Sequence, residues 1–263
     1  MRLIKTFFAA AIAASLPLAS QAAVVQLKVT VENLTPQNGI SFAPLRVGFH
    51  SGVFDAFNIG QVANAAIISV AEGGSGAAWF PAFAAADPGA VTGTILPNPA
   101  GPLVPGLSGT NTFTVDTDVN PFFTFAAMVV PSNDFFIGND SPTRFRLFDA
   151  AGNLVINDIL QRARDVWDAG SEIFDPAAAA FVGNNNLRAD QNSVVAFNFA
   201  ELAAFNGLLT AAGYNFNSQL SANSDIYRIS FAVVPSPVPV PAALPLLVGG
   251  IGALGAVARR RKA

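Results

Sequence analysis

Cysteine is absent from the 263-residue chain, and histidine occurs once, as His50. These absences exclude disulfide bonds, zinc sites built from clustered histidines, and nucleophiles made of a cysteine and a histidine. A Ser–His–Asp triad would depend on His50, but the serines in Gly74–Gly76 and Leu107–Gly109 do not form the G-x-S-x-G motif. We therefore expect a protein that is not an enzyme, with His50 as a structural hydrogen-bonding residue at a strand end.

Basic residues are scarce between the two ends of the chain. Residues 23–240 contain 8 Lys and Arg against 17 Asp and Glu, which gives this part a net charge of −9, whereas the whole chain carries −3. Nucleic-acid binding needs a basic face that neutralises phosphates. The sequence therefore argues against nucleic acid as a partner and favours a domain that handles cations.

The first 22 residues have the pattern of a secretory signal peptide. Arg2 and Lys5 precede the apolar stretch Phe7–Leu18, and Ser20–Ala22 offers a small-x-small cleavage site. The apolar stretch is too short to span a bilayer comfortably, which disfavours a permanent anchor. We therefore predict that residues 1–22 are removed and that the rest of the chain is exported.

The last 26 residues, Val238–Ala263, have three parts: a proline-rich lead, the uncharged apolar run Ala242–Ala258, and the basic cluster Arg259–Lys262. An apolar helix of about 17–25 residues is long enough to cross a bilayer. A basic cluster directly after such a run stays on the cytoplasmic side. We therefore expect residues 236–263 to hold a transmembrane segment, and residues 23–235 to form the exported domain.

The start of this tail, Val238-Pro239-Val240-Pro241-Ala242, resembles the VPLPA-type (PEP-CTERM-like) sorting signal of bacterial surface proteins. Val240 stands where that family usually has Leu, which is a mild apolar exchange. The resemblance implies that a sorting or processing protease in the membrane recognises the tail. It also implies a location in the cell envelope or at the cell surface, with at least transient anchoring in the inner membrane. A simple single-pass anchor is the alternative.

Strand patterns dominate residues 23–235. In Val25–Glu32 apolar and polar residues alternate, which is typical of a half-buried strand. Phe122–Val130 is almost entirely apolar, so we expect it to be a central strand that is covered on both faces. Strands are also predicted over Leu45–Phe49, Thr112–Val115, Arg144–Phe148, Ser193–Phe199 and Ile226–Val233.

Helix patterns are few. Ala, Val and Ile recur at three- and four-residue steps in Gln61–Glu72, and Gly73-Gly74 follows as the expected helix end. A second short helix is predicted over Asp158–Val166. The chain contains 23 Phe, enough for a sizeable core without disulfides. We therefore predict a mostly β fold, an antiparallel β-sandwich with one or two short helices at its side.

Three acidic segments are candidates for a calcium site. Asp116–Asn120 starts like an EF-hand loop, but Pro121 replaces the required Gly, so we expect a solvated hairpin edge there. Pro131–Gly138 follows the most apolar strand and contains Asp134. Trp167–Glu172 places a Gly between two acids, which lets the backbone curl so that both face one ion. Ca²⁺ prefers about six to eight oxygen ligands in such flexible loops.

Two of these segments resemble the spondin N-terminal domain family. Phe125–Gly138 is similar to the family's hydrophobic strand that ends in the pattern Met-x-x-Pro-Ser-x-Asp-Trp-x-x-Gly, and Trp167–Glu172 is similar to Trp-Asp-Ala-Gly-Thr-Asp. The resemblance extends to Val29–Thr35, the His50 region and Val70–Gly74, and it covers nearly all of residues 24–233.

This resemblance implies a calcium-binding β-sandwich of the kind found in animal extracellular-matrix and adhesion proteins. By motif position the metal ligands would be Asp134, Asp168 and Glu172. Phe135 replaces the usual Trp, and Glu172 replaces the usual Asp, which lengthens that side chain by one methylene. Animal members carry disulfides that this chain lacks, so their ligand specificity is not transferred to it.

Taken together, the residues and the resemblances predict an exported, surface-displayed Ca²⁺-binding adhesion or extracellular-matrix module that is not an enzyme. Its partners would be an extracellular polysaccharide, a glycan or a surface protein. Two alternatives stay open: a secreted hydrolase or lyase that acts on polysaccharide with carboxylates as acid and base, and a purely structural matrix protein.

Overall fold

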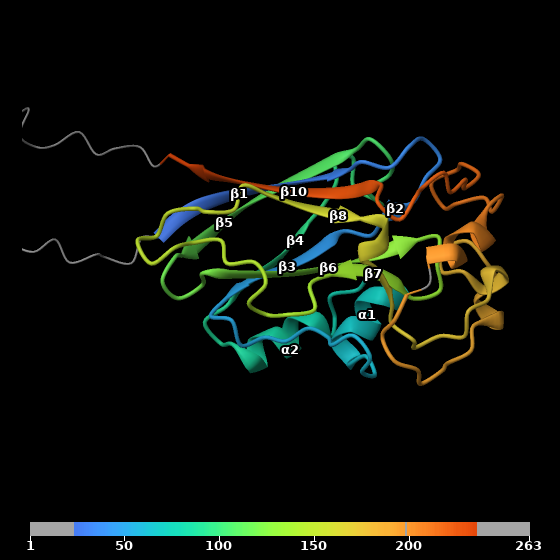
Figure 1. Cartoon of the computed structure of the whole chain (residues 1–263), viewed down its shortest axis with the longest axis horizontal. Helices are drawn as coiled ribbons and strands as arrows, with labels where there is room; N and C mark the ends of the chain where they lie inside the picture. Colours follow the sequence, from blue (N-terminus) through green and yellow to red (C-terminus); the bar gives the residue numbers. More distant parts are fainter. Residues whose placement is uncertain (1–23, 198, 236–263) are drawn as a thin grey trace, which may run out of the picture.

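Two antiparallel β-sheets pack face to face and form the body of the protein (Figure 1). The computed structural model describes residues 24–197 and 199–235. The predicted mostly β, antiparallel sandwich is confirmed. The predicted signal peptide (1–22) and sorting segment (236–263) lie outside the described residues. Within the described ranges, no helix is long and apolar enough to cross a membrane.

The first sheet has the strand order β5-β1-β10-β8, and the second has the order β4-β3-β6-β7-β9, with the short strand β2 paired to β6. The strands of the first sheet are β1 (Val24–Asn33), β5 (Ser108–Asp116), β8 (Asp158–Arg162) and β10 (Asp225–Val234). Those of the second are β2 (Ser41–Phe42), β3 (Leu45–His50), β4 (Val91–Ile95), β6 (Phe122–Val130), β7 (Phe135–Gly138) and β9 (Val166–Asp168).

The core between the sheets follows from the alternation of side chains along each strand. In β1, Leu27 and Val29 are buried while Lys28 points outward to solvent, as the sequence pattern predicts. Phe123 of β6 meets Phe231 of β10 across the sandwich, with ring centroids 5.0 Å apart. Aromatic burial of this kind stabilises the domain without any covalent cross-link.

A helical layer covers the outer face of the second sheet (Figure 1). It consists of α1 (Ala65–Gly73) and α2 (Trp79–Ala86). Alternate side chains of β6 point into this layer, so β6 is buried on both faces as predicted. The predicted helix Gln61–Glu72 starts later than expected because the side chain of Asn64 caps α1 by accepting from the amide of Ile67. At its other end Gly74 adopts the left-handed conformation, with φ of 60°.

Three sequence predictions of local structure are wrong. The predicted helix Asp158–Val166 is strand β8 followed by one 3₁₀ turn (Ala163–Asp165), because residues 158–162 alternate between exposed and buried and pair with β10. Arg144–Phe148 makes only isolated bridges, from Arg146 to Phe122 and from Phe148 to Leu154. In the described part of Ser193–Phe199, Val194 and Ala196 make isolated bridges beside the three-residue strand β9, and a 3₁₀ helix begins at Phe199.

The sequence also missed strands β2, β4, β7 and β9 and helix α2. The turn at Asp116–Asn120 connects β5 of one sheet to β6 of the other, so it is not the hairpin that we predicted. Asp116 accepts hydrogen bonds there from the amides of Asp118 and Val119, which is turn chemistry.

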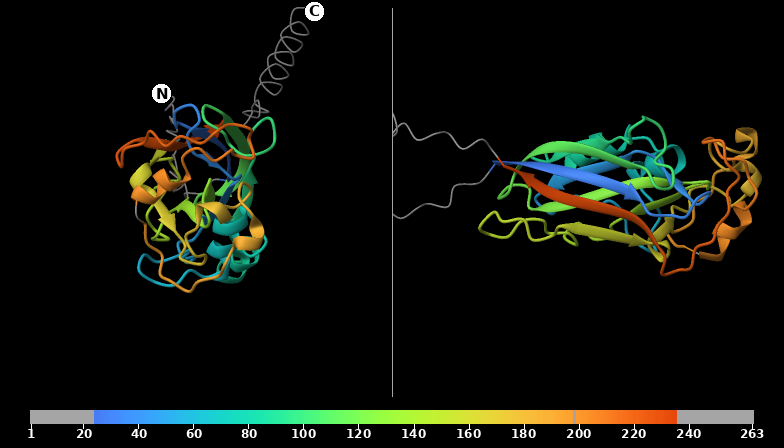
Figure 2. Two further views of the ribbon diagram at one scale, coloured as in Figure 1. Left: turned by 90° about the vertical axis from the view of Figure 1, so that its right-hand side faces the viewer. Right: turned by 90° about the horizontal axis from the view of Figure 1, so that it is seen from above.

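The irregular segment between β9 and β10 closes one end of the sandwich (Figure 2). It contains the short 3₁₀ helices η2 (Pro176–Ala178), η3 (Asn185–Leu187) and η4 (Phe199–Phe205). The start of β1 and the end of β10 lie together at the opposite end, where Gln26 pairs with Val234. The candidate site lies at the end that the irregular segment closes.

Candidate functional site

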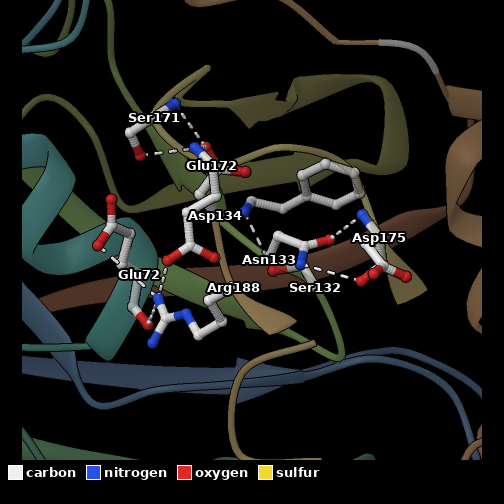
Figure 3. Close-up of polar contacts among 9 residues, drawn as sticks. Glu72, Ser132, Asn133, Asp134, Ser171, Glu172, Asp175 and Arg188 are labelled. Atoms are coloured by element: carbon white, nitrogen blue, oxygen red, sulfur yellow. Dashed lines mark hydrogen bonds and ion pairs between the residues drawn. The ribbon is translucent and has the colours of Figure 1, made fainter. Parts of the chain in front are cut away.

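Asp134 joins the two acidic segments that the sequence singled out. It lies in the turn between β6 and β7, and its side chain is 1% exposed. Its Oδ2 accepts hydrogen bonds from the amides of Ser171 (2.7 Å) and Glu172 (3.0 Å) and from the hydroxyl of Ser171 (3.1 Å) (Figure 3). Burial raises the pKa of Asp134, and these hydrogen bonds oppose the rise. The loop after β6 and the loop after β9 are therefore held together by one buried carboxylate.

The side chain of Glu172 points from this junction toward the guanidinium of Arg188. The side chain is 3% exposed, and its Oε1 accepts from the guanidinium of Arg188. Its second oxygen, Oε2, is buried and has no hydrogen-bond partner among the described atoms. Burial raises the pKa of Glu172, while Arg188 opposes the rise. A buried carboxylate oxygen without a partner is costly, so this atom needs an explanation.

Arg188 lies between two carboxylates from distant parts of the chain. Its Nη2 contacts Glu172 and lies 3.7 Å from Oε2 of Glu72, near the end of α1 (Figure 3). The same nitrogen donates to the backbone carbonyl of Glu72 at 3.4 Å. The guanidinium therefore occupies the position in which a bound cation would bridge Glu72 and Glu172.

Asp168, the third predicted ligand, lies beside this cluster in a different hollow. It ends β9 opposite Phe135, and its Oδ1 accepts from the amide of Gly170 at 2.6 Å. The hollow that it lines has a volume of about 220 Å³ and also contains Glu201. Burial, followed by the charges of Asp134 and Glu201, raises the pKa of Asp168 to about 7. Asp168 is thus electrostatically coupled to Asp134 without sharing its hydrogen bonds.

Gly170 is the residue that makes this arrangement possible. Its φ is +67°, and a Cβ at this position would lie 2.8 Å from the carbonyl oxygen of Val194. Only glycine fits both the left-handed backbone and the close approach. The backbone therefore requires glycine here, but the two acids on either side do not face one position as predicted, because Asp168 lines a different hollow from Glu172.

The cluster's chemistry suits a hard cation, but its geometry is not a closed metal site. Among residues 24–197 and 199–235, no group of three His, Cys, Asp or Glu side chains is placed to hold a metal ion. Arg188 separates Glu72 from Glu172, and Oδ2 of Asp134 already has three donors. What fits calcium is the all-oxygen donor set and the unpartnered Oε2 of Glu172.

Sequence reasoning missed Glu72 and Arg188 as members of the site. Glu72 lies in a segment that carried part of the spondin resemblance, so its position was a usable signal. Arg188 lies 16 residues after Glu172 in an irregular segment without a motif, and we find no sequence signal for it.

His50 is structural, as expected. It is fully buried, its Nε2 lies 2.9 Å from the hydroxyl of Thr124, and its Nδ1 accepts from the amide of Gly52 at 3.1 Å. The acceptor role of Nδ1 places the proton of the neutral ring on Nε2. Burial lowers the pKa of His50 to about 4, which keeps the ring neutral.

No protein-family model matches the chain, and no curated protein matches it. The likeness to spondin domains and to sorting signals therefore rests on the residues quoted above. The fold class rests on the structure.

Proposed function

We propose that the protein is an exported, non-enzymatic module that binds Ca²⁺ at one end of a β-sandwich and uses that end to contact an extracellular polysaccharide, glycan or surface protein. Asp134 and Glu172 would hold the ion, with Glu72 near them and Asp168 adding negative potential. The bound ion supplies charge neutralisation between the loops after β6 and β9. We also propose that residues 23–235 form a spondin-like domain, as the sequence motifs suggest.

The observation that carries the proposal is the buried, unpartnered Oε2 of Glu172, whose carboxylate also feels the charges of Glu72 and Asp134. The pKa values of Asp134, Asp168 and Glu172 are all raised, chiefly by burial, and Asp134 contributes to the rise at the other two. Such carboxylates favour either a proton or a cation. A divalent ion would satisfy the free oxygen and relieve the repulsion between the acids.

The location of the site suits display to a partner. Several large apolar side chains are exposed on the irregular segment that closes this end, where they are available for contact. The end of β10 lies at the far end of the sandwich, so an anchor that follows it would leave the candidate site facing away from the membrane. The exposed side chains are Ile173, Phe174, Phe181, Leu187 and Leu209.

Calorimetric titration of the full chain with calcium tests the proposal. We expect binding by the wild type and at least tenfold weaker binding by Asp134→Asn, since that change removes one charge but keeps an acceptor for the three donors. Asp116→Asn is the matched control because Asp116 belongs to the EF-hand-like turn, and it should bind as the wild type does. A wild type without heat of binding, or equal affinity in Asp134→Asn, contradicts the proposal.

One observation favours a second function, a polysaccharide hydrolase or lyase. Asp168 has a pKa of about 7 and shares a hollow with Glu201, and a carboxyl group with such a pKa is suited to act as a general acid. Screening of polysaccharides for cleavage, with Asp168→Asn as the inactive control, distinguishes this function. Product formation by the wild type alone would establish the enzyme.

A further inference from the structure

A cavity of about 350 Å³ lies next to the end of α1, and Gly73 and Gly74 contribute to its wall. Segments far apart in the sequence meet around it: the β2–β3 region, the end of α1, and the loops near residues 102, 181 and 211. Its volume falls in the range of small-ligand sites, which begins at about 300 Å³. Its walls are mainly apolar, and they include Ala43, Pro102, Val130, Phe181 and Ala211.

One charged side chain, Arg46, contributes to this wall. Its Nη1 donates to the hydroxyl of Thr94 (2.6 Å) and its Nη2 donates to the carbonyl of Gly74 (2.5 Å), so the guanidinium is held in place. No carboxylate of the described chain forms an ion pair with it, and its Nε is buried without an acceptor. A half-buried positive charge that has only neutral partners is incompletely compensated, and an anion in the cavity would compensate it.

Phe181 provides an independent sign that this wall is adapted to a ligand. It is 57% exposed and has φ of +64°, a left-handed backbone that bulky residues rarely adopt. Strain of this kind persists where the surrounding structure imposes it, often at binding sites. Here it places an aromatic side chain beside the cavity that Arg46 lines.

We propose that this cavity binds a small monocarboxylate with an apolar body, whose carboxylate pairs with Arg46 and whose body packs against the apolar wall and Phe181. A single guanidinium, without a second Lys or Arg among the described residues of the wall, suits one negative charge better than a phosphate dianion. The described part of the wall contains no Asp or Glu either, so a cationic ligand would find no partner. This site is separate from the calcium cluster and does not depend on it.

The test uses ¹⁹F NMR titration of the full chain with 4-fluorobenzoate and, as the uncharged counterpart, 4-fluorobenzyl alcohol. We expect the wild type to bind the carboxylate at least tenfold more tightly than the alcohol, because the charged hydrogen bonds to Arg46 are made only by the anion. Arg46→Met keeps most of the side-chain volume and should abolish this preference.

A second variant covers the possibility that Arg46→Met does not fold. Ala211→Trp fills the cavity from an exposed loop position and should remove carboxylate binding, whereas Ala203→Trp, exposed outside the cavity, should bind as the wild type does. Equal affinity for the carboxylate and the alcohol overturns the proposal. So does the absence of binding, or unchanged binding in Ala211→Trp.

Discussion

Replacing Arg188 by Gln is the sharpest perturbation of the candidate site, because it removes the protein's own cation from between Glu72 and Glu172. The new glutamine side chain keeps a hydrogen-bond donor but carries no charge. Without calcium the variant should be less stable, since Glu172 stays buried without its partner. With calcium the ion can occupy the vacated position, so stability should recover and calcium affinity should rise.

The magnitude follows from the geometry. Two unit charges about 4 Å apart attract by about 4 kcal/mol at an effective dielectric constant of about 20. Arg188 and Glu72 are each 27% exposed, so screening leaves only part of that attraction for their pair. Glu172 is 3% exposed, and leaving a buried charge unpaired costs about 3–5 kcal/mol. We therefore expect a loss of about 3 kcal/mol, or about 6–12 °C in Tm for a domain of this size.

Differential scanning calorimetry in EDTA and in millimolar calcium measures both effects. The Tm of Arg188→Gln should fall in EDTA and return most of the way to the wild-type value in calcium. Arg162→Gln is the matched control, because the Arg162–Asp225 pair is nearly half exposed and its loss should change stability by less than about 1 kcal/mol. An equal fall of Tm in both solutions would refute the reasoning and would make Arg188 a structural ion-pair residue only.

Three further changes follow from single contacts. The folded-state pKa of Asp168 is raised from 3.8 to about 7, so the stability that the protonated carboxyl contributes is lost as pH rises from about 4 to about 7. In EDTA, Asp168→Asn should remove this decline of Tm with pH. A pH profile of Tm equal to that of the wild type contradicts the prediction. Tyr227→Phe should stabilise by about 1 kcal/mol in urea unfolding because the buried hydroxyl has no partner among the described atoms; a loss would show a hidden partner. Gly170→Ala should cost about 1–3 kcal/mol more than Gly60→Ala, because both have a left-handed backbone but only at Gly170 would the Cβ overlap neighbouring atoms; equal costs would refute the role of the close approach.

The sequence predicted the elements in which the order of apolar and polar residues itself shows which faces are buried. Alternation in β1 and the unbroken apolar run of β6 predicted both strands, because each records directly which faces are buried. The strands β7 and β9 are four and three residues long, too short for a pattern of their own. They form because β7 pairs with β6 and β9 pairs with β7. Helix α2 is apolar on almost every side and lacks a side-chain cap, so it carried neither a period nor a start signal.

In the candidate site, too, the residues in local motifs were predicted and those brought in by tertiary contacts were not. Asp134 and Glu172 lie in local motifs, and the structure joins them through the hydrogen bonds of Asp134 to the amides of residues 171 and 172. Asp168 belongs to the same motif, yet it lines the neighbouring hollow, because it ends β9 while Glu172 lies beyond the left-handed turn at Gly170.

Arg188 is the residue that changes how the site is understood, and its contacts arise only from tertiary structure. It neutralises Glu172 with a side chain instead of an ion, which explains how acidic loops fold together while Oε2 of Glu172 still has no partner among the described atoms. An internal cation lowers the gain from calcium by the free energy of the contacts that calcium must displace. If calcium binds, its affinity is therefore set by the competition between the ion and Arg188, and a substitution at that one position should shift it further than the exchange of Asp for Glu at position 172.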